Sequence, residues 1–128
     1  MKECPFTFKL LLFVAPFIFP GLLWAQLDTE NPLRFLALGD SYTIGESVPA
    51  TQRWPKQLTD SLNARGITTD TLNLIATTGW RTDNLLNAIS NKSLGNQHYN
   101  FVSLLIGVNN QYQGRAFAQY QLEFPALL

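Results

Sequence analysis

Cysteine and histidine are almost absent from this sequence of 128 residues, which contains one of each, Cys4 and His98. A single cysteine cannot form a disulfide within the chain. One cysteine and one histidine far apart in the sequence cannot build a zinc site, which normally needs four ligands or three and a water. The sequence therefore excludes a disulfide-stapled domain and a structural zinc domain.

An excess of charge of one sign is also lacking. Nine Lys and Arg residues balance nine Asp and Glu residues, and the basic residues form no run or cluster. Proteins that bind nucleic acid depend on clustered Lys and Arg side chains that contact phosphates. We therefore expect no nucleic-acid partner, and the overall charge gives no support for a strongly anionic substrate.

A long apolar run occurs at one place, residues 10–24, after two lysines and before the small residue Ala25. This order of positive, apolar and small residues is typical of a secretory signal peptide. The run is shorter than the roughly 20 residues of a membrane span, and two prolines interrupt it. We expect a signal peptide at residues 1–25, cleaved after Ala25, and a short polar leader at residues 26–33. The mature protein would be secreted or periplasmic without stable membrane insertion, the alternative being an uncleaved anchor.

The remaining residues alternate between short apolar runs and segments of helical periodicity. Apolar runs suited to buried strands alternate with patterns in which apolar residues recur every three or four positions. This alternation favours an α/β fold with a parallel sheet covered by helices on both faces. The predicted strands lie at residues 34–38, 71–76 and 101–106, and the predicted helices at residues 55–65, 82–90 and 116–128.

Each predicted strand is followed by a segment that contains glycine. These segments are Gly39–Ser41, Thr78–Trp80 and Gly107–Asn110. In open parallel sheets, ligands bind beyond the carboxyl ends of the strands. We therefore expect the three segments, far apart in the sequence, to converge on one edge of the sheet.

The three segments carry groups that suit acyl transfer. Ser41 offers a hydroxyl on the turn that leaves the first strand, where free backbone N–H groups are available. Gly79 offers an N–H that no side chain obstructs, and Asn109 offers an amide donor. Each has a simpler interpretation: Ser41 as a turn or helix-capping residue, Gly79 as a residue with positive φ, and Asn109 with Asn110 as loop-shaping residues.

Together the segments resemble the three sequence blocks of the SGNH (GDSL) hydrolase family. The Gly-Asp-Ser block corresponds to ALGDSYTIGE at residues 37–46, the Gly block to ATTGWRTDNL at residues 76–85, and the Gly-x-Asn block to LIGVNNQYQG at residues 105–114. The resemblance implies a three-layer α/β/α, flavodoxin-like fold. It covers residues 34–128, which we interpret as a partial hydrolase domain.

The resemblance also implies roles at the matching positions. Ser41 would be the nucleophile and a backbone oxyanion donor, Gly79 the second donor and Asn109 the third donor through its side chain. Asp40 would orient the loop, and Asn110 occupies a position that is often Asp in the family. The implied reaction is hydrolysis of a small-molecule or carbohydrate ester through an acyl-enzyme, with no metal or other cofactor.

One family block has no counterpart in the sequence. The family places its catalytic base in a late Asp-x-x-His block, whereas His98 precedes the third predicted strand and should lie at the opposite edge from Ser41. We therefore expect a C-terminally truncated domain that is inactive or incomplete, from a truncated or frameshifted gene or from a short protein completed by another chain. The alternatives are a non-catalytic ligand-binding module and, disfavoured by the lack of a glycine-rich phosphate loop, a flavodoxin-like nucleotide binder.

Overall fold

Three parallel strands form the centre of the computed structural model, which describes residues 31–92 and 97–128. Their order in the sheet is β2-β1-β3, and both outer strands pair in parallel with the central one. The strands are β1 (Leu33–Gly39), β2 (Thr69–Ala76) and β3 (Phe101–Leu105).

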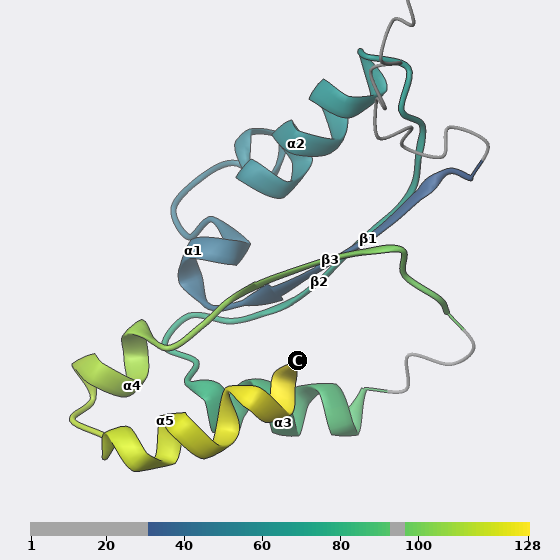
Figure 1. Ribbon diagram of the computed structural model, residues 1–128. Coiled ribbons are helices and arrows are strands. Elements are labelled where there is room, and N and C mark those ends of the chain that lie inside the picture. Colours follow the sequence, from purple (N-terminus) through teal and green to yellow (C-terminus); the bar gives the residue numbers. More distant parts are fainter. Residues whose placement is uncertain (1–30, 93–96) are drawn as a thin grey trace, which may run out of the picture.

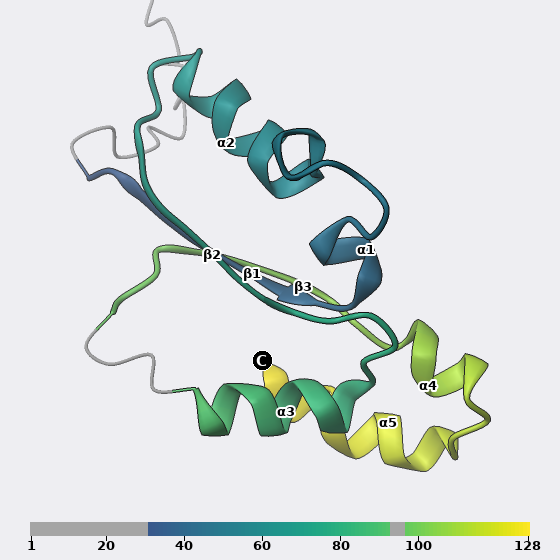
Figure 2. The same cartoon turned by 180° about the vertical axis from the view of Figure 1, so that it is seen from behind.

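Helices cover both faces of this sheet (Figure 1). The helices α1 and α2 lie on one face, and α3 and α5 lie on the other, while α4 lies beyond the carboxyl ends of the strands. The reverse view shows the same two layers on either side of the strands (Figure 2). This arrangement confirms the predicted three-layer α/β/α class. The helices are α1 (Ser41–Ile44), α2 (Trp54–Asn63), α3 (Thr82–Asn91), α4 (Val108–Tyr112) and α5 (Phe117–Glu123), with 3-10 turns at Ala50–Gln52 and Pro125–Leu127.

The core is built around β1, which among the described strands is the one bonded on both sides. Alternate residues of a strand point to opposite faces of its sheet. Leu36 and Leu38 join a cluster with Leu85 of α3, whereas Phe35 packs its ring against Trp54 and Phe101. Because both faces of β1 are covered, an uninterrupted apolar run is stable there.

The strand β3 differs from its prediction as a buried strand. Its residues Phe101, Val102 and Leu105 are 39%, 52% and 49% exposed. Within the described part of the chain, β3 bonds only to β1, so its outer edge is open. An apolar run does not reveal whether a strand lies inside a sheet or at its edge, and here the sheet order decides its burial.

The C-terminal segment also differs from its prediction. A single helix is predicted over residues 116–128, whereas the structure has α5 followed by a 3-10 turn. The reason is Pro125, which has no backbone N–H to continue the α-helical ladder. The helix α4 has no counterpart among the predicted helices.

The predicted signal peptide and most of the predicted leader lie outside the described residues. Among the helices of residues 31–92 and 97–128, none is long and apolar enough to span a membrane.

Candidate active site at the carboxyl edge of the sheet

Segments from all three strand ends meet at one edge of the sheet, where α1 and α4 lie close to the turn after β2 (Figure 1). The side chain of Asn109 connects them directly. Its Nδ2 donates to the carbonyl of Trp80 at 2.9 Å and contacts Oδ2 of Asp40 at 3.4 Å. Thr78 adds a further link, because its hydroxyl donates to the carboxylate of Glu46.

A close backbone approach places Ser41 at this edge. A Cβ atom on Gly39 would lie 2.5 Å from the carbonyl oxygen of Leu105 and closer still to the side chain of Thr43. Only glycine fits there, so β1 can run tightly past β3 and turn directly into α1. Ser41 is the first residue of α1 and is half-buried.

Asp40 stabilises the turn between β1 and α1 with its buried side chain. Its side chain is fully buried and caps α1, with Oδ1 accepting a hydrogen bond from the N–H of Tyr42 at 3.0 Å. Such caps stabilise a helix because its first N–H groups have no partner inside the helix. Asp40 therefore holds α1 with one carboxylate oxygen and faces Asn109 with the other.

Two backbone donors at this edge remain available. The N–H groups of Ser41 and Gly79 donate to no group of the described residues. Gly79 has φ of 76°, in the left-handed region, and no atom would contact a Cβ at this position. Glycine is therefore needed here for its backbone conformation and not for space.

Asn109 supplies a third donor, from the side chain of α4. One of its amide hydrogens is used by the carbonyl of Trp80. The contact with Asp40, at 3.4 Å, is at the long limit for a hydrogen bond, so the second hydrogen is only weakly engaged. Ser41, Gly79 and Asn109 thus bring three donors to the same strand-end edge.

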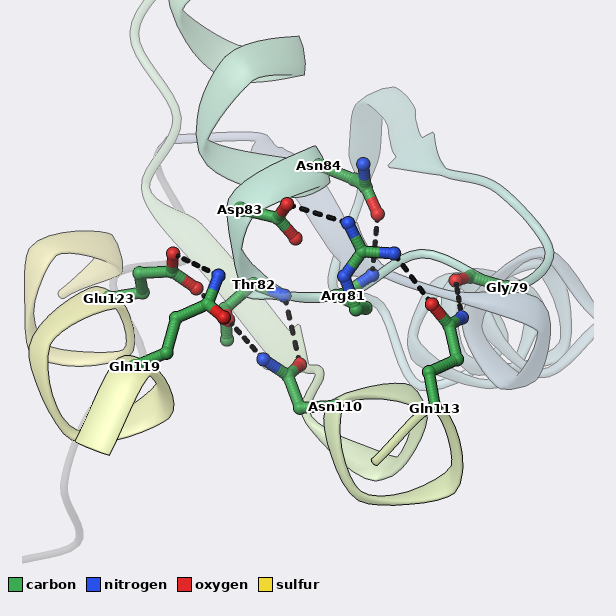
Figure 3. A network of polar contacts seen from close by, with 9 residues as sticks. All are labelled: Gly79, Arg81, Thr82, Asp83, Asn84, Asn110, Gln113, Gln119 and Glu123. Carbon is green, nitrogen blue, oxygen red and sulfur yellow. Dashed lines mark hydrogen bonds and ion pairs between the residues drawn. The ribbon is translucent and has the colours of Figure 1, made fainter. Parts of the chain in front are cut away.

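Asn110 has a different environment from Asn109, although the two are adjacent. It is buried and faces the start of α3, where its Oδ1 accepts from the N–H of Thr82 at 3.1 Å and its Nδ2 donates to the Thr82 hydroxyl at 2.7 Å. That hydroxyl in turn donates to the carboxylate of Glu123 on α5 (Figure 3). Asn110 therefore joins α4 to α3 instead of facing Ser41.

Two residues that the sequence did not single out, Arg81 and Gln113, also contact this region. Gln113 Nε2 donates to the carbonyl of Gly79 at 2.8 Å, and Arg81 donates to Gln113 Oε1 at 2.6 Å. Arg81 also pairs with Asp83 at 2.7 Å, and this hydrogen bond lowers the pKa of the Asp83 carboxyl even though partial burial acts in the opposite direction. The spacing of Asn109 and Gln113, one helical turn apart, was the available sequence signal, but it is informative only if residues 108–112 are helical.

His98 lies far from these groups along the strand direction. It precedes β3 at the amino ends of the strands and is exposed, and its backbone carbonyl accepts from Nε of Arg34 at 2.6 Å. In the described part of the chain, no group of three or more His, Cys, Asp or Glu side chains is arranged to hold a metal ion.

A cleft of about 340 Å³ lies between the start of α1 and the start of α4. Its lining contains both chain neighbours of Ser41, Asp40 and Tyr42, together with Leu105, Ile106 and Val108, but not Ser41 itself. Most of this lining is apolar. A larger cleft, of about 600 Å³, lies between α4 and α5 and includes neither neighbour of Ser41.

Comparison with known proteins gives consistent matches. The GDSL-like Lipase/Acylhydrolase family matches residues 37–128. The chain is similar in structure to AlinE4, described as an SGNH-hydrolase family esterase, with a TM-score of 0.64, 21% identity, and coverage of 73% of this chain and 50% of that one. It is also similar to TesA, with a TM-score of 0.63, 22% identity, and coverage of 71% and 49%.

The similarity covers only part of each matched structure. The chain spans about half the length of the solved structures it matches, and it shares their fold. No curated protein matches the chain.

Proposed function

The chain belongs to the GDSL-like lipase/acylhydrolase family, and from this premise we propose that its site is built for hydrolysis of carboxylic esters with Ser41 as the nucleophile. Ser41 Oγ would attack the ester carbonyl and give a tetrahedral oxyanion. Collapse of this intermediate releases the alcohol and leaves an acyl-serine, which water then hydrolyses to the acid and free Ser41.

The observation that carries this proposal is the set of three donors at one edge. The N–H groups of Ser41 and Gly79, which donate to no group of the described residues, would form an oxyanion hole together with the Asn109 amide. Donors fixed before the reaction stabilise the charge that develops in the transition state, and loss of one typically lowers the rate by about 10²–10³-fold.

The cleft beside Ser41 supports an ester with an apolar part. Leu105, Ile106 and Val108 line it together with Tyr42 and Asp40. We assign this cleft to an uncharged, apolar group of the ester, because most of its lining is apolar and no basic side chain of the described residues lines it. The substrate class is then a neutral small-molecule ester or an acylated carbohydrate.

The proposed reaction needs a base, and the described residues place no histidine beside Ser41. Their single histidine, His98, lies at the amino ends of the strands. In a well-characterised serine hydrolase, loss of the base lowers turnover by about 10⁶-fold. We propose that the base comes from outside these residues, either from a longer protein or from another chain, and that the chain alone is nearly inactive.

The expected signal peptide at residues 1–25 supports action outside the cytoplasm. We therefore propose that the protein is secreted or periplasmic and meets its ester substrate there.

A second candidate is a non-catalytic module that binds an acyl or sugar ligand in the same cleft. The position of His98, far from Ser41, favours this candidate, because a site without a base can bind an ester without turning it over. The two candidates differ in whether Ser41 becomes reactive when a base is supplied.

The test is an assay of p-nitrophenyl acetate hydrolysis by the chain over a range of imidazole concentrations, with imidazole as the soluble base. Three variants are measured beside it: Ser41→Ala, Asn109→Leu and, as the control, Ser61→Ala on the exposed face of α2. Rates are taken as the excess over imidazole alone at each concentration.

The hydrolase proposal expects an excess rate that rises with imidazole for the chain and for Ser61→Ala, and that is lost in Ser41→Ala. Asn109→Leu should lower this rate by about 10²-fold, as expected for loss of one oxyanion donor. An excess rate that is the same with and without the Ser41 hydroxyl would reject the hydrolase proposal and leave the binding module.

A further inference from the structure

The segment from Gly79 to Thr82 is held by side chains of α4 and the residue that follows it (Figure 3). Gln113 donates to the carbonyl of Gly79, and Asn110 bonds both the N–H and the hydroxyl of Thr82. The carbonyl of Trp80, between them, accepts from Asn109. Side chains of α4 and of Gln113 thus bind backbone groups that lie 28 to 34 positions earlier in the sequence.

The amide of Gln113 is oriented at both ends. Its Nε2 donates to the carbonyl of Gly79 at 2.8 Å, and its Oε1 accepts from Arg81 at 2.6 Å. Arg81 is itself held by Asp83, at 2.7 Å. Because an Arg side chain can only donate, it forces the oxygen of the Gln113 amide toward itself and the NH₂ group toward Gly79.

Side-chain packing does not fix the conformation of Gly79. Its φ of 76° is one of several conformations open to glycine, and no side chain packs where its Cβ would lie. Packing therefore does not fix the direction of its N–H. The turn is closed locally by the hydrogen bond from the N–H of Trp80 to the carbonyl of Thr77, at 3.2 Å. The hydrogen bonds to the carbonyls of Gly79 and Trp80 add to it and attach the turn to the α4 segment.

We propose that Gln113, oriented by Arg81, is a positioning residue for the oxyanion hole. The inference rests on the proposed function, since it assigns a role to the N–H of Gly79. Asn109 and Gln113 lie one helical turn apart on the same side of the α4 segment. The α4 segment thus contributes to the proposed oxyanion hole in two ways. Asn109 supplies an amide donor, and Gln113 holds the loop that carries the N–H of Gly79.

Gln113 does not touch the reacting atoms, so its effect should be confined to the transition state. An oxyanion hole binds the charged tetrahedral state more strongly than the neutral ester. A misdirected Gly79 N–H should therefore lower kcat with little change in KM.

The experiment compares the chain with Gln113→Met and Gln113→Glu, and uses Gln111→Met as the matched control. Gln111 is an exposed glutamine of α4, and its side chain has no hydrogen bond within the described residues. Methionine removes both bonds of Gln113. Glutamate keeps the acceptor for Arg81 but loses the donor to Gly79.

The first measurement is the backbone order of Gly79 by ¹⁵N NMR relaxation, which does not depend on activity. We expect lower order at Gly79 in both Gln113 variants and no change in Gln111→Met. The second measurement is Ser41-dependent hydrolysis with imidazole. Here we expect kcat to fall by about tenfold, less than the 10²–10³-fold for a removed donor, with KM unchanged.

The Gln113→Glu variant distinguishes a positioning role of Gln113 from a general contribution to the stability of the fold. If Gln113 only stabilised the fold, glutamate would restore the chain, because it still pairs with Arg81. Unchanged order at Gly79 in Gln113→Met would overturn the inference, as would full recovery of order and kcat in Gln113→Glu. Should Gln113→Met fail to fold, Arg81→Met replaces it and is expected to lower the order of Gly79 in the same direction.

Failure of the proposed function would be recognised separately. In that case no Ser41-dependent rate would exist even in the unsubstituted chain, whereas the NMR comparison would still show whether Gln113 orders the turn.

Discussion

Asp40 illustrates how much of the site depends on a single buried side chain. One carboxylate oxygen caps α1 through the N–H of Tyr42, and the other faces the amide of Asn109. An asparagine at this position has one acceptor oxygen in place of two, so it can keep only one of these contacts.

We predict that Asp40→Ala lowers the free energy of unfolding by about 1–2 kcal/mol, the usual cost of a lost helix cap. Asp40→Asn should lose clearly less, because its side-chain oxygen can still accept from Tyr42. Urea unfolding followed by circular dichroism measures both. Equal losses in the two variants would show that the cap is not what stabilises the turn.

Asp83 provides a prediction about pH. Its pKa lies below its ordinary value of 3.8, first because of the hydrogen bond from Arg81. A carboxyl whose pKa is lower in the folded state stabilises the fold at pH values above its unfolded pKa, and this contribution is lost as the pH falls through the folded pKa.

We therefore predict that Arg81→Met raises the pKa of Asp83. The variant should lose stability at neutral pH, because it removes both the pair with Asp83 and the hydrogen bond to Gln113. The part of this loss that comes from the pair with Asp83 should disappear at pH values below the folded pKa of Asp83, whereas the part that comes from the Arg81–Gln113 hydrogen bond should remain. Titration of the Asp83 carboxyl by ¹³C NMR measures the shift, and an unchanged pKa would contradict the assigned cause. Lys56→Met, which breaks an exposed pair with Asp60, is the control.

At the scale of the elements, the position of α1 against the sheet depends on Gly39. A methyl group there would meet Thr43 and the carbonyl of Leu105, so α1 or β3 must move to admit it. Gly66 offers a contrast, because it has φ of 83° and no atom near its Cβ position. The two glycines thus separate steric from conformational effects.

We predict that Gly39→Ala costs about 1–3 kcal/mol through overpacking and shifts the amide resonances of Ser41 and Leu105. Gly66→Ala should cost about 1–2 kcal/mol, the strain of a left-handed alanine, without affecting those resonances. Denaturant unfolding and ¹H–¹⁵N spectra of both variants measure these effects. Unperturbed resonances at Ser41 in Gly39→Ala would mean that the close approach does not hold α1 in place.

Elements with strong local signals were predictable, and those held by distant contacts were not. The helix α2 has Pro55 in its first turn and a regular apolar spacing, so its position could be predicted. By contrast, α4 has five residues, too few to be stable alone. The side chains of Asn109 and Asn110 bond residues about 30 positions earlier in the chain, which no local pattern reveals.

The same distinction applies to the candidate site. Ser41, Gly79 and Asn109 could be selected because each follows a predicted strand, and parallel strands end at a common edge. Arg81 and Gln113 could not, since their contacts exist only once α4 is formed. Burial of β3 was predicted wrongly because its apolar run gives no information on which strands flank it.

At the scale of the whole molecule, the open edge of β3 is the most exposed apolar feature of the sheet. Its outer backbone groups have no strand partner among the described residues, and Val102 and Leu105 are about half exposed. Such edges pair readily with other chains unless charges or prolines block them. Neither occurs within β3, whose sequence is FVSLL.

We predict that the chain self-associates with increasing concentration and that Val102→Lys weakens this association. Val48→Lys, at an exposed valine in the loop before α2, should leave it unchanged. Sedimentation velocity over a range of concentrations measures both. If the chain stays monomeric at all concentrations, or if the Val102→Lys variant associates as strongly as the unsubstituted chain, the edge of β3 does not mediate self-association.

The joint role of Ser41, Gly79 and Asn109 is tested most directly by NMR titration of the chain with phenylboronic acid. This compound can form a tetrahedral, negatively charged adduct on a serine hydroxyl and so mimics the proposed intermediate. We predict that it shifts the backbone amides of Ser41 and Gly79 and the side-chain amide of Asn109, and that Ser41→Ala abolishes all three shifts. Shifts confined to other residues, or retained in Ser41→Ala, would contradict an oxyanion hole at this edge of the sheet.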